Sequence, residues 1–296
     1  PITYINDSKR AIEQLWGPLD VLSFTKKLSC KIKVSIESKD IELLFLLAIE
    51  DWSSDYSKWL KNKLQLKPFP NEMLYRNVCK TDHLVLNFTS LPPSYENKVF
   101  YTKVPFVLLE IGSTKPMDDI RSKLQTDCLK LKKIVQLLSN FSYYKVQIGL
   151  LFWNVSNETV NLEEVLSTLE LSNIENSEII SQIHICDMTL ELKEKTTKYF
   201  IQGSSINARL NNLFANLVDN YRGEYSARGK KKLEKYKQQL KRNRVSSQRP
   251  VLEAAQIIKT KENDLLKRAK ELRRYNYLSR HVASANLTHQ NNTIGV

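Results

Sequence analysis

The chain has 296 residues, of which 42% are hydrophobic, so it is long enough to form a substantial core. The formal net charge of +13 points to a polyanionic partner, and only seven glycines are present to build the glycine-rich loops that hold nucleotide phosphates. The longest apolar stretch, residues 41–49, is far shorter than the roughly 20 residues of a membrane span, which predicts a soluble chain without a membrane partner.

The first part of the chain predicts both helices and strands. Residues 5–16 have apolar side chains at helical spacing, and residues 28–36 alternate partly, as a strand does. Residues 41–66 are rich in Leu and Trp and free of Gly and Pro, which predicts one helix, or two with a break near Ser53. Residues 81–88 predict a strand that is entered through polar residues.

The clearest pattern lies in the middle of the chain. Residues 98–111 predict a strand whose apolar end contains a single carboxylate, Glu110. Residues 117–140 have helical spacing, and the apolar run 146–153 predicts a second strand. Strand, helix and strand form the unit of an α/β core with a parallel pair, so the predicted fold is α/β with a mixed central sheet flanked by helices.

The last part of the chain changes character. Residues 183–192 predict a further strand, and residues 204–221 predict an amphipathic helix. Two basic helical segments follow, separated by a break at residues 246–250. The predicted organisation is an α/β domain at 1–222 with its core at about 40–200, a basic helical extension at 223–281 and a disordered tail at 282–296.

The positive charge is concentrated in the extension. Residues 222–281 contain 19 Lys and Arg against 6 Asp and Glu, whereas the rest of the chain contains 26 of each. Because lysine and arginine bind phosphates, the expected partner is nucleic acid, either DNA or RNA. The residues expected to bind it are Lys230, Lys231, Lys232, Lys235, Lys237, Lys241, Arg242 and Arg244.

Two other interpretations of the extension stay open. Its basic cluster has the composition of a nuclear targeting signal, which would place the protein in the nucleus of a eukaryotic cell. The extension could also be a pair of helices that binds a protein partner, with the preceding domain as a scaffold. The four cysteines are widely spaced and lack a metal-ligand pattern, which favours a reducing, intracellular compartment.

Two carboxylates and a lysine suggest a catalytic site. Asp82 enters one predicted strand, Glu110 ends the next, and Lys115 follows in the loop beyond. Two carboxylates can hold a divalent ion against a scissile phosphate, while a lysine neutralises charge or orients the attacking water. The pattern predicts a nuclease with Mg²⁺ bound by Asp82 and Glu110, assisted by Lys115 or by Lys130 on the following helix.

These residues resemble the PD-(D/E)XK nuclease superfamily, in particular its divergent mobile-element and Crinkler-type members. Thr81-Asp82, the strand 106–111 around Glu110, and the helical stretch 127–131 carry the resemblance, which covers about residues 40–155. It implies a restriction-endonuclease-like core and metal-dependent phosphodiester hydrolysis. The lysine of the family's E-x-K motif would stand at position 112, where this chain has Gly112, so that Lys115, Lys123 or Lys130 would have to replace it.

Each site residue also has a structural interpretation. Glu110 could pair at the rim of the sheet, and Asp82 could be a turn residue, because Asp is common where a turn meets a strand. Asp127 and Lys130 could form an ion pair between residues three apart on one helix. Under these interpretations the chain would be a catalytically inactive nuclease-fold adaptor or an interaction protein.

Overall fold

The fold comes from a computed structural model, which describes residues 1–5, 18–32, 41–70, 74–92, 96–115, 119–154, 160–189 and 204–291. Side chains are described in the same ranges, except at residues 204–205, 244–253 and 282–291. The chain divides into two compact units, Pro1–Glu234 and Lys235–Val296. All of the strands in the described part of the chain belong to the first unit.

An eight-stranded sheet forms the centre of the first unit, with the order β1-β8-β7-β6-β2-β5-β4-β3. The first six strands in this order are parallel to one another, and β3 and β4 add an antiparallel edge. The predicted α/β class with a mixed sheet is therefore confirmed. The strands are β1 (Ile2–Ile5), β2 (Ile41–Ala48), β3 (Lys67–Phe69), β4 (Leu74–Lys80), β5 (Leu84–Ser90), β6 (Phe106–Ser113), β7 (Val146–Asn154) and β8 (Ile180–Asp187).

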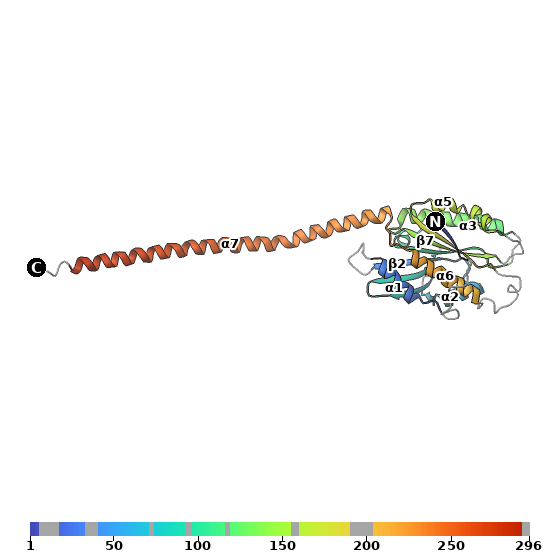
Figure 1. The fold of residues 1–296 in the computed structure, drawn as a ribbon, viewed down its shortest axis with the longest axis horizontal. Coiled ribbons are helices and arrows are strands. Elements are labelled where there is room, and N and C mark those ends of the chain that lie inside the picture. Colours follow the sequence, from blue (N-terminus) through green and yellow to red (C-terminus); the bar gives the residue numbers. More distant parts are fainter. Residues whose placement is uncertain are drawn as a thin grey trace. The chain divides into compact units, whose positions relative to one another are not determined.

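Helices cover both faces of the sheet, with α1, α2 and α6 on one side and α3 and α5 on the other (Figure 1). Successive residues of β2 enter opposite cores: Phe45 and Leu47 face one layer of helices, while Leu46 and Ala48 face the other. The helices are α1 (Val21–Lys31), α2 (Asp55–Lys63), the 3-10 turn η1 (Lys98–Tyr101), α3 (Ile120–Phe141), α4 (Leu162–Thr168), α5 (Leu171–Glu175), α6 (Ser204–Asn220) and α7 (Ala227–Asn291).

The strand, helix, strand unit at the middle of the sequence is confirmed. It consists of β6, α3 and β7, and the two strands pair in parallel from Phe106 to Ser113. The strand expected at residues 81–88 is β5, and the helix expected at residues 204–221 is α6. All nine residues of β7 are buried, because helices cover both faces of the sheet there.

Three predicted elements are wrong in whole or in part. The strand expected at residues 98–111 begins only at Phe106, and residues 98–101 form the 3-10 turn η1 instead. Residues 41–48 form the strand β2 rather than the start of a helix, and only residues 55–63 are helical. A run that is buried on both faces lacks the alternation that distinguishes a strand from a buried helix. The strand expected at residues 28–36 overlaps the end of α1, and residues 33–40 lie outside the described part of the chain, as does most of the helix expected at residues 5–16.

Helix α7 has 65 residues and is continuous through the break expected at residues 246–250. The fixed φ of proline is compatible with a helix, and Pro250 removes one N–H donor from the ladder. The helix also extends beyond residue 281, to Asn291. Of the helices in the described part of the chain, none is long and apolar enough to cross a membrane.

Candidate functional site

The two carboxylates expected to share a metal lie at opposite edges of the sheet. Strand β2 pairs in parallel with both β5 and β6, so all three strands run in the same direction. Asp82 precedes Leu84, which is level with the start of β2, whereas Glu110 follows Leu109, which is level with Ala48 at its end. At about 3.3 Å per residue, these two levels are roughly 23 Å apart. The structure therefore does not bring Asp82 and Glu110 together.

Asp82 lies in an exposed turn before β5. The turn is closed by Thr81, whose N–H donates to the carbonyl of Leu84 at 2.8 Å. The Leu84 N–H donates in return to the hydroxyl of Thr81 at 3.2 Å. Both Asp82 and His83 are exposed in this turn. This placement agrees with the interpretation of Asp82 as a turn residue.

Glu110 lies at the carboxyl edge of the parallel sheet, in a group of charged residues that we call the carboxyl-edge cluster. Its other members are Glu50, which follows β2, and three residues of α3: Lys123, Asp127 and Lys130. Lys123 forms ion pairs with Asp127 and, at 3.4 Å, with Glu50. Lys130 lies 3.2 Å from Glu50. Each lysine therefore has a carboxylate partner inside the cluster.

The ion pairs differ from those expected on the helix. Asp127 pairs with Lys123, four residues before it, and not with Lys130. Lys130 instead reaches Glu50, and only 9% of its side chain is exposed. Sequence reasoning missed Glu50, although it directly follows an apolar run, as Glu110 lies near the end of another. Parallel strands bring their carboxyl ends to the same edge, and so these two acids become neighbours.

The carboxyl group of Glu110 has an unusual environment. It is half-buried on β6, and no hydrogen bond or ion pair joins it to the described residues. Burial raises its pKa from 4.5 to about 7, because the charged form loses hydration, while the nearby Lys130 acts in the opposite direction. A carboxyl group with a pKa near neutrality can both accept and release a proton under ordinary conditions.

Gly112 has a structural role at the position where a lysine was expected. Its φ is +75°, a conformation that side chains rarely adopt, and a Cβ atom there would lie 2.1 Å from the carbonyl oxygen of Trp153. The Gly112 N–H donates a 2.8 Å hydrogen bond to Oδ2 of Asp127, whose side chain is completely buried. The strand could not accommodate a lysine at this position without rearrangement.

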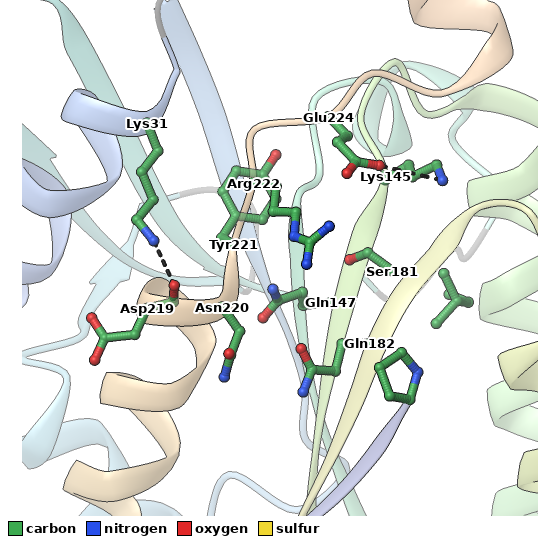
Figure 2. Close-up of a pocket in the computed structure, with 12 residues that line it drawn as sticks. Lys31, Lys145, Gln147, Ser181, Gln182, Asp219, Asn220, Tyr221, Arg222 and Glu224 are labelled. Carbon is green, nitrogen blue, oxygen red and sulfur yellow. Dashed lines mark hydrogen bonds and ion pairs between the residues drawn. The ribbon is translucent and has the colours of Figure 1, made fainter.

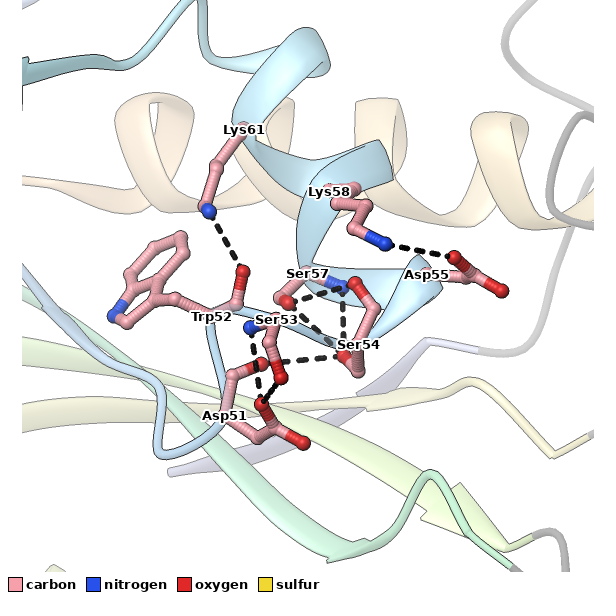
Figure 3. Close-up of polar contacts among 8 residues, drawn as sticks. All are labelled: Asp51, Trp52, Ser53, Ser54, Asp55, Ser57, Lys58 and Lys61. Carbon is pink, nitrogen blue, oxygen red and sulfur yellow. Dashed lines mark hydrogen bonds and ion pairs between the residues drawn. The ribbon is translucent and has the colours of Figure 1, made fainter.

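Lys115 lies beyond the cluster and joins two loops. Its ammonium group is 2.7 Å from Oδ2 of Asp51, in the loop that follows β2, although 71% of the lysine side chain is exposed. The Asp51 carboxylate also accepts hydrogen bonds from the N–H and hydroxyl of Ser53 (Figure 3). The contacts with Lys115 and Ser53 hold the pKa of Asp51 far below the usual range. Ser54 then caps α2 by accepting from the N–H of Ser57 at 3.1 Å.

The carboxyl-edge cluster offers proton transfer more readily than metal binding. The ammonium groups of Lys123 and Lys130 contact the carboxylate oxygens of Glu50 and Asp127 that a metal ion would need as ligands. Among the residues described, no group of three or more His, Cys, Asp or Glu side chains could hold a metal ion. Magnesium binding stays a prediction from the sequence, without a site in that part of the chain.

A polar pocket of about 460 Å³ lies at the opposite, amino edge of the sheet (Figure 2). Its lining includes Gln147 of β7, Gln182 of β8 and Arg222, which follows α6. Two of its charged side chains are already paired: Lys31 donates to the carbonyl of Asp219 at 2.6 Å, and Lys145 lies 3.4 Å from Glu224. The two amides are bonded as well: Oε1 of Gln147 lies 3.2 Å from Nε2 of His184, and the Gln182 amide donates to the Thr3 hydroxyl at 2.8 Å.

The basic residues expected to bind nucleic acid lie on α7. Within the first unit, Lys230 and Lys231 are exposed, and the ammonium group of Lys232 lies 4.2 Å from the centre of the Tyr143 ring. Arg244 lies outside the part of the helix whose side chains are described. In the second unit the exposed members of the set are Lys235, Lys237, Lys241 and Arg242.

Comparisons with known proteins give no family for the chain. No protein-family model and no curated protein matches it. Among solved structures, a nucleolar GTP-binding protein 1 from Plasmodium falciparum matches with a TM-score of 0.36 and 12% identity, over 71% of this chain and 98% of that chain. At this TM-score the similarity assigns neither a fold nor nucleotide binding to the present chain.

The predicted resemblance to PD-(D/E)XK nucleases is wrong. No family model, of a nuclease or of any other protein, matches the chain. The geometry agrees, because Asp82 and Glu110 lie at opposite edges of the sheet and Gly112 leaves no room for the family's lysine. The predicted nuclease function falls with the resemblance, and so do the restriction-endonuclease-like core and the inactive nuclease-fold adaptor.

Proposed function

We propose that the basic extension binds nucleic acid through the phosphate backbone. The supporting observation concerns the ion pairing and the exposure of the basic side chains in the extension. In the second unit, the Lys and Arg side chains described between residues 235 and 280 form no ion pair. From residue 254 to residue 281 every side chain is exposed. Unpaired cations on an exposed helix are available to a polyanion.

Several lysines of the first unit, by contrast, are paired with acidic side chains. Lys115, Lys123, Lys130 and Lys132 each lie within 4.0 Å of a carboxylate in the same unit. The parts of the chain outside residues 222–281 contain equal numbers of acidic and basic residues, 26 of each. The extension is thus the segment whose charge needs a partner from outside the chain.

Binding of this kind would be strongly salt-dependent. Each phosphate that a lysine or arginine neutralises releases a condensed counterion, so the logarithm of the association constant falls by about 0.7 to 0.9 per neutralised phosphate for each tenfold rise in salt. Phosphate contacts do not read base sequence, and the proposal therefore does not include sequence specificity.

The test measures binding of fluorescent DNA and RNA to the full chain across a series of salt concentrations. One variant replaces Lys235, Lys237, Lys241 and Arg242 with Gln. We expect weaker binding and a salt slope that is smaller by about 0.7 to 0.9 for each phosphate that the variant no longer neutralises.

A matched variant replaces four exposed lysines of the first unit, and so removes the same total charge. These are Lys26, Lys58, Lys67 and Lys98. We expect this variant to bind nearly as well as the wild type. Equal decreases in affinity in the two variants would show that net charge, and not the extension, governs binding, and this result would overturn the proposal.

A further inference from the structure

In the second unit, Tyr277 has basic side chains above and below it on the same side of α7. The residues three and four positions before Tyr277 are Arg274 and Arg273, and those three and four positions after it are Arg280 and His281. At 100° per residue, all four lie within about 60° of Tyr277 around the helix, as does Lys270 one turn further back. Each of these side chains is exposed.

The tyrosine ring is presented to the outside of the helix. It is 65% exposed, and the ring of His281 packs against it edge-on with 4.4 Å between centroids. This contact restricts the ring without covering it. An exposed aromatic ring adds little to folding here, because none of the side chains described in the second unit is buried.

A second tyrosine shows that the arrangement is specific to Tyr277. Tyr275 is equally exposed, at 72%, but lies about 200° away around the helix. Its neighbours at three and four positions are Glu271, Leu272, Leu278 and Ser279, none of which is basic, and Arg268, one turn further back, is the one basic residue on its side of the helix within seven positions before it. The two tyrosines therefore form a natural comparison: they have the same ring on the same helix, but Tyr277 has four basic neighbours at three and four positions and Tyr275 has none.

We propose that Tyr277 is a stacking platform for a base of single-stranded nucleic acid, with the flanking arginines on the adjacent phosphates. The inference rests on the proposed function, since it assumes that α7 binds nucleic acid. An aromatic side chain among cations is the combination that single-strand binders use: the cations follow the backbone, and the ring stacks on a base.

The base must come from a single strand for a geometric reason. In a duplex each base is covered on both faces by its neighbours, so that a ring on a helix surface reaches only phosphates and groove edges. In a single strand a base can turn out and lay its face on the ring. Tyr277 should thus increase affinity for single strands and leave duplex binding unchanged.

The test compares binding of the full chain to oligothymidylate and to a DNA duplex of the same length, with the wild type beside Tyr277→Leu and Tyr275→Leu. We expect Tyr277→Leu to weaken single-strand binding at least about fivefold, as removal of a stacking ring does, and to leave duplex binding within about twofold. Tyr275→Leu should change neither. Tyr277→Phe keeps the ring and should bind like the wild type.

The outcomes separate the inference from the function on which it rests. Salt-sensitive binding of both nucleic acids, with Tyr277→Leu equal to Tyr275→Leu, would overturn the stacking platform and leave the proposed function intact. A wild type that binds neither nucleic acid would overturn both. Circular dichroism of each variant checks that the helix content is unchanged.

Discussion

The buried carboxylate of Asp127 holds the backbone of Gly112 in place, with 2.8 Å between Oδ2 and the glycine nitrogen. The same carboxylate pairs with Lys123 through its other oxygen. The Asp127 side chain therefore binds both the backbone of β6 at Gly112 and the ammonium group of Lys123 on its own helix. A buried carboxylate is stable only when both of its oxygens are satisfied in this way.

We expect Asp127→Asn and Asp127→Ala to destabilise the protein by different amounts. Asparagine can still accept from the Gly112 N–H but removes the ion pair with Lys123, while alanine removes both interactions. The expected decreases in stability are about 1 to 2 kcal/mol for Asn and about 3 to 4 kcal/mol for Ala. Urea unfolding at neutral pH measures both values. Equal decreases would show that the hydrogen bond to Gly112 contributes nothing to stability.

We expect Gly112→Ala to cost about 2 kcal/mol or more, because a Cβ atom at a φ of +75° meets the carbonyl oxygen of Trp153 at 2.1 Å. Gly149→Ala is the matched control. There the new atom meets the flexible end of Leu108 at 3.1 Å, with no positive φ. We expect a smaller destabilisation at Gly149, measured by the shift in urea midpoint. The reverse order would contradict the backbone constraint at Gly112.

The sequence predicted the unit β6-α3-β7 better than the neighbouring strand β2. The unit β6-α3-β7 could be predicted because its strands are long apolar runs and α3 has clear helical spacing. Residues 41–48 were misassigned because a strand buried on both faces gives no alternation to distinguish it from a helix. The decisive information, namely that helices cover both faces of β2, lies in the tertiary structure.

The prediction of the candidate site was incomplete for a related reason. Glu110 was identified correctly as a carboxylate at the end of a buried strand, but its neighbours depend on strand order. Because β2 lies beside β6, Glu50 joins the carboxyl-edge cluster. Asp82, in the turn before β5, lies at the opposite, amino edge of the parallel strands. Spacing along the chain contains no information about which strands become neighbours.

We expect the ionisation of Glu110 to lower stability as the pH rises. Its folded pKa of about 7 exceeds the ordinary value of 4.5, so the folded state binds the proton more tightly than the unfolded state does. Stability from this group is present below pH 4.5 and is lost as the pH rises through 7, by roughly 3 kcal/mol in total. Glu110→Gln should remove this pH-dependent decrease.

Urea unfolding of wild type and Glu110→Gln between these two pH values is the measurement. The stability of the variant relative to the wild type should increase steadily as the pH rises. Taking the difference cancels the other groups that titrate in the same range. A difference that stays constant with pH would mean that the Glu110 pKa is not raised.

We expect the protonation of His184 to lower stability as the pH falls, which is the opposite pH dependence to that of Glu110. It is completely buried on β8, with Nε2 3.2 Å from Oε1 of Gln147 and no hydrogen-bond partner for Nδ1 among the described residues. Burial lowers its pKa from 6.5 to about 4, because the charged ring would lose its hydration. The unfolded chain therefore binds the proton more readily. Stability from this group is present above pH 6.5 and is lost as the pH falls toward 4.

Proton NMR of the histidine rings measures this pKa directly, with the His184 resonance identified by its absence in His184→Gln. The resonance should not shift until the pH falls well below 6.5. Between pH 6.5 and about 4 the wild type should lose stability relative to His184→Gln, by roughly 3 kcal/mol at the acid end. A His184 ring that titrates near 6.5 would show that the ring keeps its hydration in the folded protein. The expected acid destabilisation from this group would then be absent.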